Sequence, residues 1–134
     1  MFQEQLQISN VTSPYRYPQV FGFVSELLNG QGRLLSFGCS IGDEVFTLAE
    51  RHFDHSTIVG VDISADAVAM AEQRLREPDN PALKPRSVDL RDNAISFVTP
   101  DRLGTEPFDA VFAMSVLCRW PPGKITETFP YTLF

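Results

Sequence analysis

Apolar positions along the chain alternate between a helical period and the short runs that are typical of buried strands. The first helical stretch begins at Pro18 and stops at Asn29-Gly30, which predicts a helix over residues 18–29. A second helix is expected over residues 43–53. A third is expected to follow Ser64, a typical N-cap residue, and to run through Arg76.

Short apolar runs between these helices predict the strands. They span residues 33–37, 57–62, 84–88 and 108–114. Residues 89–107 contain two prolines and little periodicity, so we expect a loop there, with one turn of helix near residues 93–97. The alternation of strands and helices predicts an α/β fold with a Rossmann-like, doubly wound parallel sheet of about four strands.

The turn from Gly38 to Gly42 joins the first predicted strand to a helix, which is where open α/β sheets bind ligands. Glycines let the backbone approach a ligand closely, and free N–H groups at the helix start face the same ligand. The second strand ends at Asp62, whose carboxylate can accept two hydrogen bonds from a ribose diol. A nucleoside cofactor is therefore predicted. The alternatives are a tight turn without a ligand and a solvated carboxylate.

The spacing of the glycines and the charges after them favour one cofactor over another. The dinucleotide fingerprint G-x-G-x-x-G is absent, because the spacing here is G-x-x-x-G. Asp43 and Glu44 would place negative charge where a pyrophosphate would bind. S-adenosylmethionine has no phosphate and carries a sulfonium and an ammonium group, so the pattern favours it over NAD.

Composition narrows the classes of partner. The chain has 134 residues, 43% apolar, and a net charge of −6, which disfavours nucleic acid as a partner. No apolar run approaches the roughly 18 residues of a membrane span, and no secretory signal is recognisable. Cys39 and Cys118 have neither zinc nor disulfide spacing. We therefore expect a cytoplasmic protein with no membrane contact and no metal site.

Residues 37–49, F-G-C-S-I-G-D-E-V-F-T-L-A, resemble the cofactor loop of the chemotaxis-receptor protein-glutamate methyltransferases, A-G-C-S-x-G-E-E-x-Y-S-L-A. Two weaker similarities flank this loop. Residues 12–18 resemble the family's T-x-F-F-R-[DE]-P, and residues 108–117 resemble F-D-x-I-x-C-R-N-V-L, with Met114 and Ser115 in place of the arginine and asparagine. The resemblance covers residues 12–120 and implies an S-adenosylmethionine-dependent methyltransferase.

The resemblance also implies which residues contact the cofactor. An acid after the third strand would hold the adenine amino group, and Asp89 is the residue predicted for that place. Ile63 would pack on the adenine, while Met114 and Ser115 would lie near the methyl group. For Asp89 the alternative is a turn residue, and for Glu44 it is a partner of the helix dipole. The candidate cofactor contacts are Thr12, Arg16, Gly38, Cys39, Ser40, Gly42, Glu44, Asp62, Ile63, Asp89, Leu90, Met114 and Ser115.

Methyl transfer from a sulfonium has a neutral leaving group, so alignment of the two reactants is the main requirement. A carboxylate acceptor needs no general base, whereas a hydroxyl or amine does. No good candidate for a base lies near the fourth predicted strand, so the catalytic residue stays unknown. The acceptor also stays unknown, with an oxygen nucleophile on a small molecule or a protein as the expectation.

Domains of this family continue beyond the fourth strand. Residues 18–134 are therefore expected to form the cofactor-binding part of a truncated methyltransferase domain. Residues 1–17 are expected to form an N-terminal arm. Self-association is expected to cover the exposed edge of the fourth strand. The alternative function is an inactive or binding-only fragment that retains part of a nucleoside site.

Overall fold

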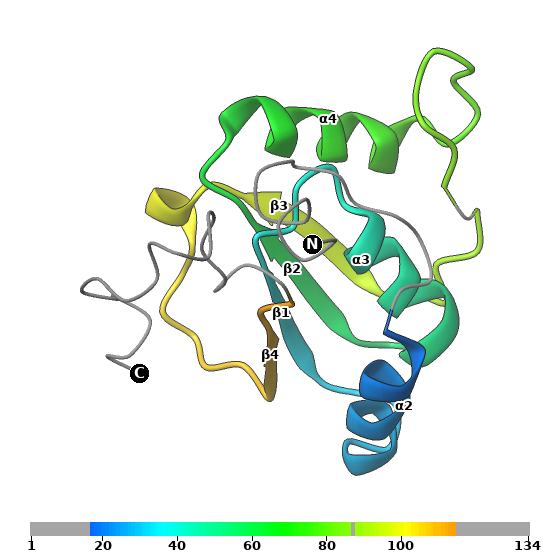
Figure 1. The fold of residues 1–134 in the computed structure, drawn as a ribbon, viewed down its shortest axis with the longest axis vertical. Coiled ribbons are helices and arrows are strands. Elements are labelled where there is room, and N and C mark those ends of the chain that lie inside the picture. Colours follow the sequence, from blue (N-terminus) through cyan, green and yellow to red (C-terminus); the bar gives the residue numbers. More distant parts are fainter. Residues whose placement is uncertain (1–16, 87, 115–134) are drawn as a thin grey trace, which may run out of the picture.

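The computed structural model describes residues 17–86 and 88–114, and every element below lies in these ranges. Four parallel strands form one sheet in the order β3-β2-β1-β4 (Figure 1). The strands are β1 (Arg33–Phe37), β2 (Thr57–Val61), β3 (Ala94–Val98) and β4 (Ala110–Phe112). The predicted α/β fold with a Rossmann-like parallel sheet is confirmed.

The helices form where the sequence predicts them, with small differences at their ends. They are α2 (Pro18–Leu27), α3 (Asp43–Thr47), which continues into the π-helical turn η1 (Leu48–His52), and α4 (Ala65–Arg76). Asn29 and Gly30 have φ values of 55° and 73°, and this left-handed backbone follows the end of α2. At the start of α4 the Ser64 hydroxyl accepts a hydrogen bond from the Ala67 N–H at 3.1 Å, as an N-cap does.

The third strand is not at residues 84–88, where the sequence pattern predicts it. It lies at Ala94–Val98, within the predicted loop and over the predicted turn of helix. This strand is at the edge of the sheet, and only Phe97 is buried in it, so its apolar signal is weak. The carbonyls of Lys84 and Pro85 accept hydrogen bonds from the Arg74 side chain instead of a neighbouring strand.

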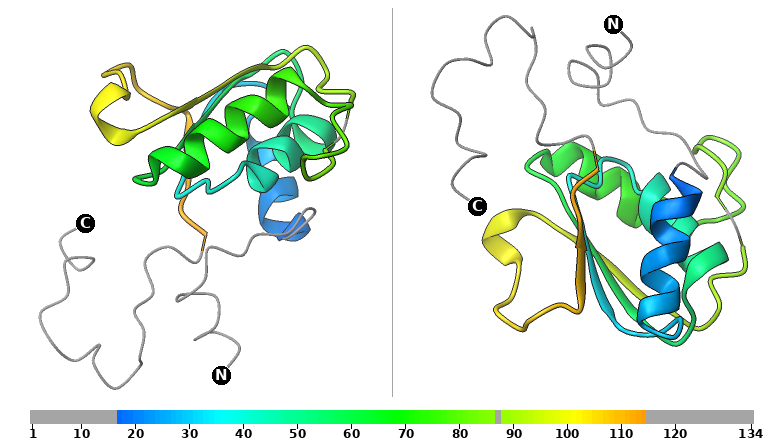
Figure 2. Two further views of the ribbon diagram at one scale, coloured as in Figure 1. Left: turned by 90° about the horizontal axis from the view of Figure 1, so that it is seen from above. Right: turned by 60° about the horizontal axis from the view of Figure 1, so that its bottom comes forward.

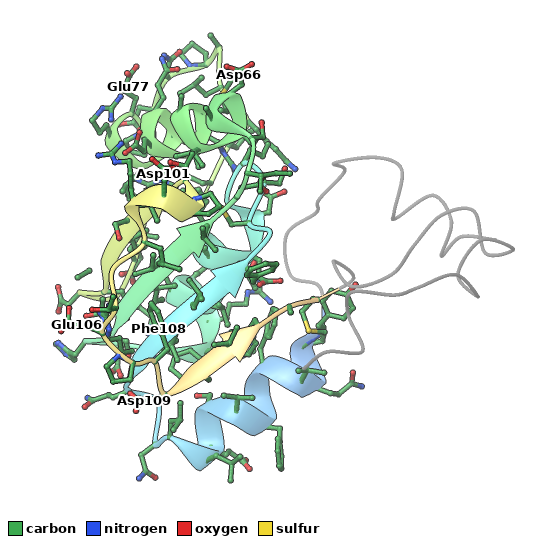
Figure 3. The ribbon with its side chains drawn as sticks, turned by 90° about the vertical axis from the view of Figure 1, so that its left-hand side faces the viewer. Asp66, Glu77, Asp101, Glu106, Phe108 and Asp109 are labelled. Carbon is green, nitrogen blue, oxygen red and sulfur yellow. The ribbon has the colours of Figure 1, made fainter. Side chains whose placement is uncertain are left out.

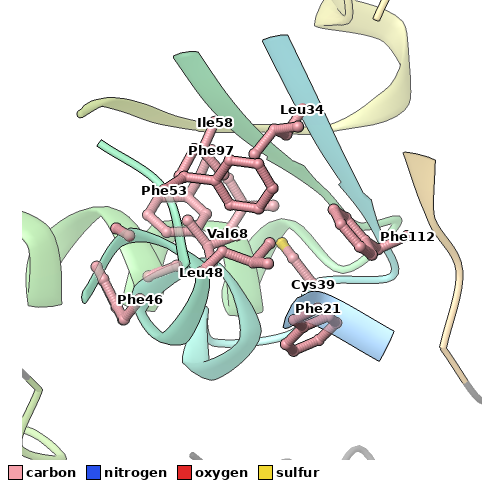
Figure 4. Packing of buried hydrophobic residues seen from close by; sticks show 13 residues of the cluster. Phe21, Leu34, Cys39, Phe46, Leu48, Phe53, Ile58, Val68, Phe97 and Phe112 are labelled. Carbon is pink, nitrogen blue, oxygen red and sulfur yellow. The ribbon is translucent and has the colours of Figure 1, made fainter. Parts of the chain in front are cut away.

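The helices α2, α3 with η1, and α4 pack on one face of the sheet (Figure 2). Side chains from that face of the sheet and from the helices form the main core, shown in Figure 4. Its buried members are Phe21, Leu34, Cys39, Val45, Phe46, Leu48, Ala49, Phe53, Ile58, Val68, Ala71, Phe97 and Phe112.

The opposite face of the sheet carries a smaller cluster. Leu35, Val59 and Val61 are buried there against Leu103 and Phe108 of the connection between β3 and β4. The connections to β2 and β3 therefore cross one face, and the connection to β4 crosses the other. This change of side occurs where the strand order reverses at β1, which is where open α/β sheets bind ligands. None of the helices in the described ranges is long and apolar enough to cross a membrane.

Candidate cofactor site

The turn between β1 and α3 has a left-handed backbone at three of its five positions. Gly38, Ser40 and Gly42 have φ values of 77°, 52° and 99°. At Gly42 a Cβ atom would also lie 3.0 Å from ring carbons of Phe46 and Phe97. Gly42 is therefore required by the backbone and by the core packing beneath the turn, whether or not a ligand is bound.

Asp62 holds this turn from the end of β2. Its Oδ2 accepts a hydrogen bond from the Ser40 N–H at 2.8 Å, and its Oδ1 accepts one from the Ser64 N–H at 2.9 Å. A carboxylate oxygen has two lone pairs, so each can accept a further hydrogen bond. The half-buried carboxylate is thus fixed beside the glycine turn in a form that suits a ribose diol.

Apolar side chains near Asp62 are unusually exposed. Ile63 follows Asp62 and is 88% exposed, and Phe37 at the end of β1 is 48% exposed. Met114, just beyond β4, is half-buried against the main core. These residues give the carboxyl edge of the sheet an apolar surface against which an adenine ring could pack.

The Cys39 thiol belongs to the core. Burial and, to a smaller extent, the nearby charge of Asp62 raise the pKa of Cys39 to about 12. Its Sγ faces β2 closely enough that a Cβ on Gly60 would come within 2.9 Å of it. The thiol is therefore protonated at neutral pH, and only the backbone of Cys39 is suited to contact a ligand.

Two acidic residues open α3, and their side chains have different partners. Glu44 Oε2 accepts a hydrogen bond at 2.7 Å from the hydroxyl of Ser36, which is completely buried in β1. Asp43 is buried and pairs with Arg74 at 3.0 Å and with Lys84. The sequence argument that Asp43 repels a pyrophosphate is therefore wrong, because the side chains of Arg74 and Lys84 pair with its carboxylate and neutralise it.

Asp89 and Leu90 are a second correction. They precede the amino end of β3. Asp62, in contrast, follows Val61, which pairs with Val98 at the carboxyl end of β3. Asp89 accepts a hydrogen bond from the Arg91 N–H at 3.0 Å in a turn at the opposite end. It is a turn residue, and neither Asp89 nor Leu90 lies near Asp62.

The acid that follows the third strand is Asp101, which sequence reasoning missed. It lies on the short 3-10 helix η2 (Pro100–Arg102), three residues after Val98 (Figure 3). A hydrogen bond from the Thr99 side chain holds the pKa of Asp101 below its usual value. The Asp62 N–H donates to the Val98 carbonyl at 3.2 Å, which joins the ends of β2 and β3. Placing the strand at residues 94–98 would have identified Asp101.

Three predicted contacts, Thr12, Arg16 and Ser115, lie outside the described residues. Within the described ranges no group of three or more His, Cys, Asp or Glu side chains is arranged to hold a metal ion.

The glycine turn, the fixed acid at the end of β2 and the reversal of strand order define a Rossmann-like α/β domain with a candidate ligand site at the carboxyl ends of its strands. Residues 35–130 match the family model described as methyltransferase domain. This match covers more than half of the chain, so the protein belongs to the methyltransferase domain family. No curated protein is similar enough to the chain to count as a relative.

Solved structures with a similar arrangement include several methyltransferases. YjhP from E. coli is 22% identical, with a TM-score of 0.46 over 75% of this chain and 38% of that chain. A SAM-dependent methyltransferase from Methanosarcina mazei is 20% identical, with a TM-score of 0.44 over 66% of this chain and 39% of that one. A protein-L-isoaspartate O-methyltransferase is 16% identical, with a TM-score of 0.45 over 72% and 28%.

The chain thus spans less than two fifths of the length of these three structures. The family match is to methyltransferase domains in general. The closer resemblance to chemotaxis-receptor methyltransferases stays a prediction.

Proposed function

We propose that this chain binds S-adenosylmethionine at the carboxyl ends of β1, β2 and β3, as the cofactor-binding part of a methyltransferase that acts on an oxygen nucleophile. The observation that carries the proposal is the Asp62 carboxylate, which is hydrogen-bonded to the Ser40 N–H of the glycine turn. In this position one side chain orders the turn and presents acceptor oxygens for the ribose. Membership of the methyltransferase domain family supports the choice of cofactor.

Glu44 is the residue proposed for the cationic end of the cofactor. Its carboxylate is held against buried Ser36, the position two residues before the first glycine of the turn. Methyltransferases commonly have an acidic residue at that position, so the Ser36–Glu44 pair would supply a carboxylate in the same neighbourhood. The negative charge of this carboxylate would favour a ligand with an ammonium or sulfonium group.

The adenine is expected at the ends of β2 and β3. Ile63 offers exposed apolar surface for one face of the ring. Asp101 takes the role predicted for Asp89, because it is the acid that follows the third strand. The lowered pKa of Asp101 keeps its carboxylate ionised at neutral pH, so that it can accept a hydrogen bond from the adenine amino group.

S-adenosylmethionine would supply an activated methyl group and a neutral leaving group. The residues of this chain would then bind the cofactor and align it, which is the main requirement for an in-line displacement. A carboxylate acceptor suits the site because it is already a nucleophile and needs no general base. The acceptor would be a small molecule or a protein.

A second candidate function is binding of the cofactor without methyl transfer. The exposure of Ile63 and Phe37 favours it, because an acceptor site is normally shielded from water.

Calorimetric titration of the chain with S-adenosylhomocysteine tests the proposal. We expect saturable binding, and no comparable binding of NAD, because the Glu44 carboxylate beside the turn would repel a pyrophosphate. Asp62→Ala is expected to weaken binding at least tenfold, since a carboxylate that accepts hydrogen bonds contributes about 1.5–3 kcal/mol. The matched control is Asp66→Ala, which removes an exposed carboxylate from the first turn of α4.

Absence of binding at millimolar S-adenosylhomocysteine, or equal binding by the Asp62→Ala and Asp66→Ala variants, would contradict the assignment. Binding by the parent without transfer of labelled methyl to any acceptor would favour the second function.

A further inference from the structure

Arg74 is a charged side chain enclosed within the protein. It projects from the last turns of α4 and is only 1% exposed. Its guanidinium donates hydrogen bonds to the carbonyls of Ile41 at 2.6 Å, Pro85 at 3.0 Å and Lys84 at 3.1 Å. It also pairs with the Asp43 carboxylate at 3.0 Å and lies 5.0 Å from the centre of the Phe46 ring.

Such a side chain is not needed to fill the space between α4 and α3. Transfer of a guanidinium from water to the interior is unfavourable, and an apolar side chain of similar volume is often at least as stabilising. What an apolar residue could not do is bind the Ile41 carbonyl and the Asp43 carboxylate at the same time. The planar guanidinium presents several donors in a fixed geometry and can reach both.

Both of these acceptors belong to the glycine turn and the start of α3. Ile41 is the fourth residue of the turn, and its carbonyl faces the buried Arg74 side chain. The next N–H, of Gly42, donates to the Cys39 carbonyl at 2.9 Å, so the peptide group between Ile41 and Gly42 is fixed at both ends. On the other side of the turn, Asp62 binds the Ser40 N–H.

We propose that Arg74 is a positioning residue for the cofactor. It holds the second half of the turn, from Ile41 to Asp43, in the conformation that binds S-adenosylmethionine, while Asp62 holds the first half. This inference rests on the proposed function, because it takes the turn as the cofactor loop. Arg74 acts through the backbone and does not touch the ligand. The loss of this constraint leaves the turn to be ordered at the moment of binding, which lowers affinity.

Arg86 provides a matched control. Its guanidinium lies 5.4 Å from the centre of the same Phe46 ring and donates to the carbonyls of Arg74 and Leu75 at the end of α4. Arg86→Met therefore removes an arginine from the same cluster and loosens the same helix. The hydrogen bonds of Arg86 reach α4, whereas those of Arg74 include one to Ile41 of the turn.

The experiment compares S-adenosylhomocysteine binding by the parent, Arg74→Met, Arg74→Lys and Arg86→Met, at a temperature where circular dichroism shows each protein folded. Arg74→Met is expected to bind about tenfold more weakly, equivalent to about 1.4 kcal/mol. Arg74→Lys is expected to lie between Arg74→Met and the parent, because lysine keeps the charge near Asp43 without the fork that also reaches Ile41. Arg86→Met is expected to lower the melting temperature while binding within twofold of the parent.

Hydrogen exchange of the Gly42 and Asp43 amides in the ligand-free proteins gives a second measurement. We expect faster exchange in Arg74→Met than in Arg86→Met. If Arg74→Met does not fold, Arg74→Lys is used for both the affinity measurement and the hydrogen-exchange measurement.

Equal affinity of the Arg74 variants and the parent, or equal exchange of these amides in the Arg74 and Arg86 variants, would overturn the inference alone. Failure of the parent itself to bind would overturn both this inference and the proposed function.

Discussion

Replacement of Gly60 by alanine is expected to destabilise the protein through the packing beneath the glycine turn. Gly60 lies near the end of β2, and a side chain at this position would project into the main core. A Cβ atom at this position would lie 2.8 Å from Cδ1 of Phe97 and 2.9 Å from Sγ of Cys39. Both distances are shorter than ordinary contacts between carbon or sulfur atoms, so the ring or the turn must move.

The size of the effect follows from how little these neighbours can move. Phe97 is 2% exposed and Cys39 is 2% exposed, and both belong to the main core. Insertion of a methyl group into a well-packed core typically costs about 1–3 kcal/mol. For a chain of this size we expect a decrease in melting temperature of roughly 3–15 °C.

Urea denaturation followed by far-ultraviolet circular dichroism measures this loss directly. The control is Gly104→Ala, because Gly104 is exposed and a Cβ there would meet no atom within 4 Å. The double variant Gly60→Ala with Cys39→Ala should lose less stability than the two single variants lose in sum, by about 0.5 kcal/mol or more, since it removes the overlap with Sγ of Cys39. Equal stability of Gly60→Ala and Gly104→Ala would refute the packing argument.

Two further predictions concern the core thiol and α2. Because burial raises the pKa of Cys39 from 9.0 to about 12, the folded state keeps its proton where the unfolded state loses it. Stability is therefore expected to fall as pH rises from about 9 towards 12, and to fall less in Cys39→Ala; equal slopes in urea titrations would contradict this. Gly22 lies within α2, and a Cβ there would meet no atom within 4 Å, so Gly22→Ala should stabilise the protein by about 0.5–1 kcal/mol. A lower urea midpoint for Gly22→Ala would count against this assignment of the helix.

The fold was largely predictable because its central strands and its helices have strong local signals. β1 and β2 are short apolar runs with buried centres, and α4 has both a capping serine and an apolar stripe. The third strand was misplaced because an edge strand buries one side chain and leaves its neighbours partly or fully exposed. The predicted adenine-binding acid is wrong for the same reason, because Asp89 precedes the strand and Asp101 follows it.

The sequence alone determined the order of the elements, the glycine turn and the acid at the end of β2, because each depends on residues that are close together in the chain. It could not determine which way a charged side chain faces. Asp43 and Glu44 are adjacent in the sequence, yet one is buried against Arg74 and Lys84 and the other is bonded to Ser36 in β1. Arg74 is 31 residues beyond Asp43 and reads as an ordinary helical arginine. Only the packing of α4 against the turn makes it a buried partner of that turn, since contacts across layers depend on the tertiary structure and leave no local pattern.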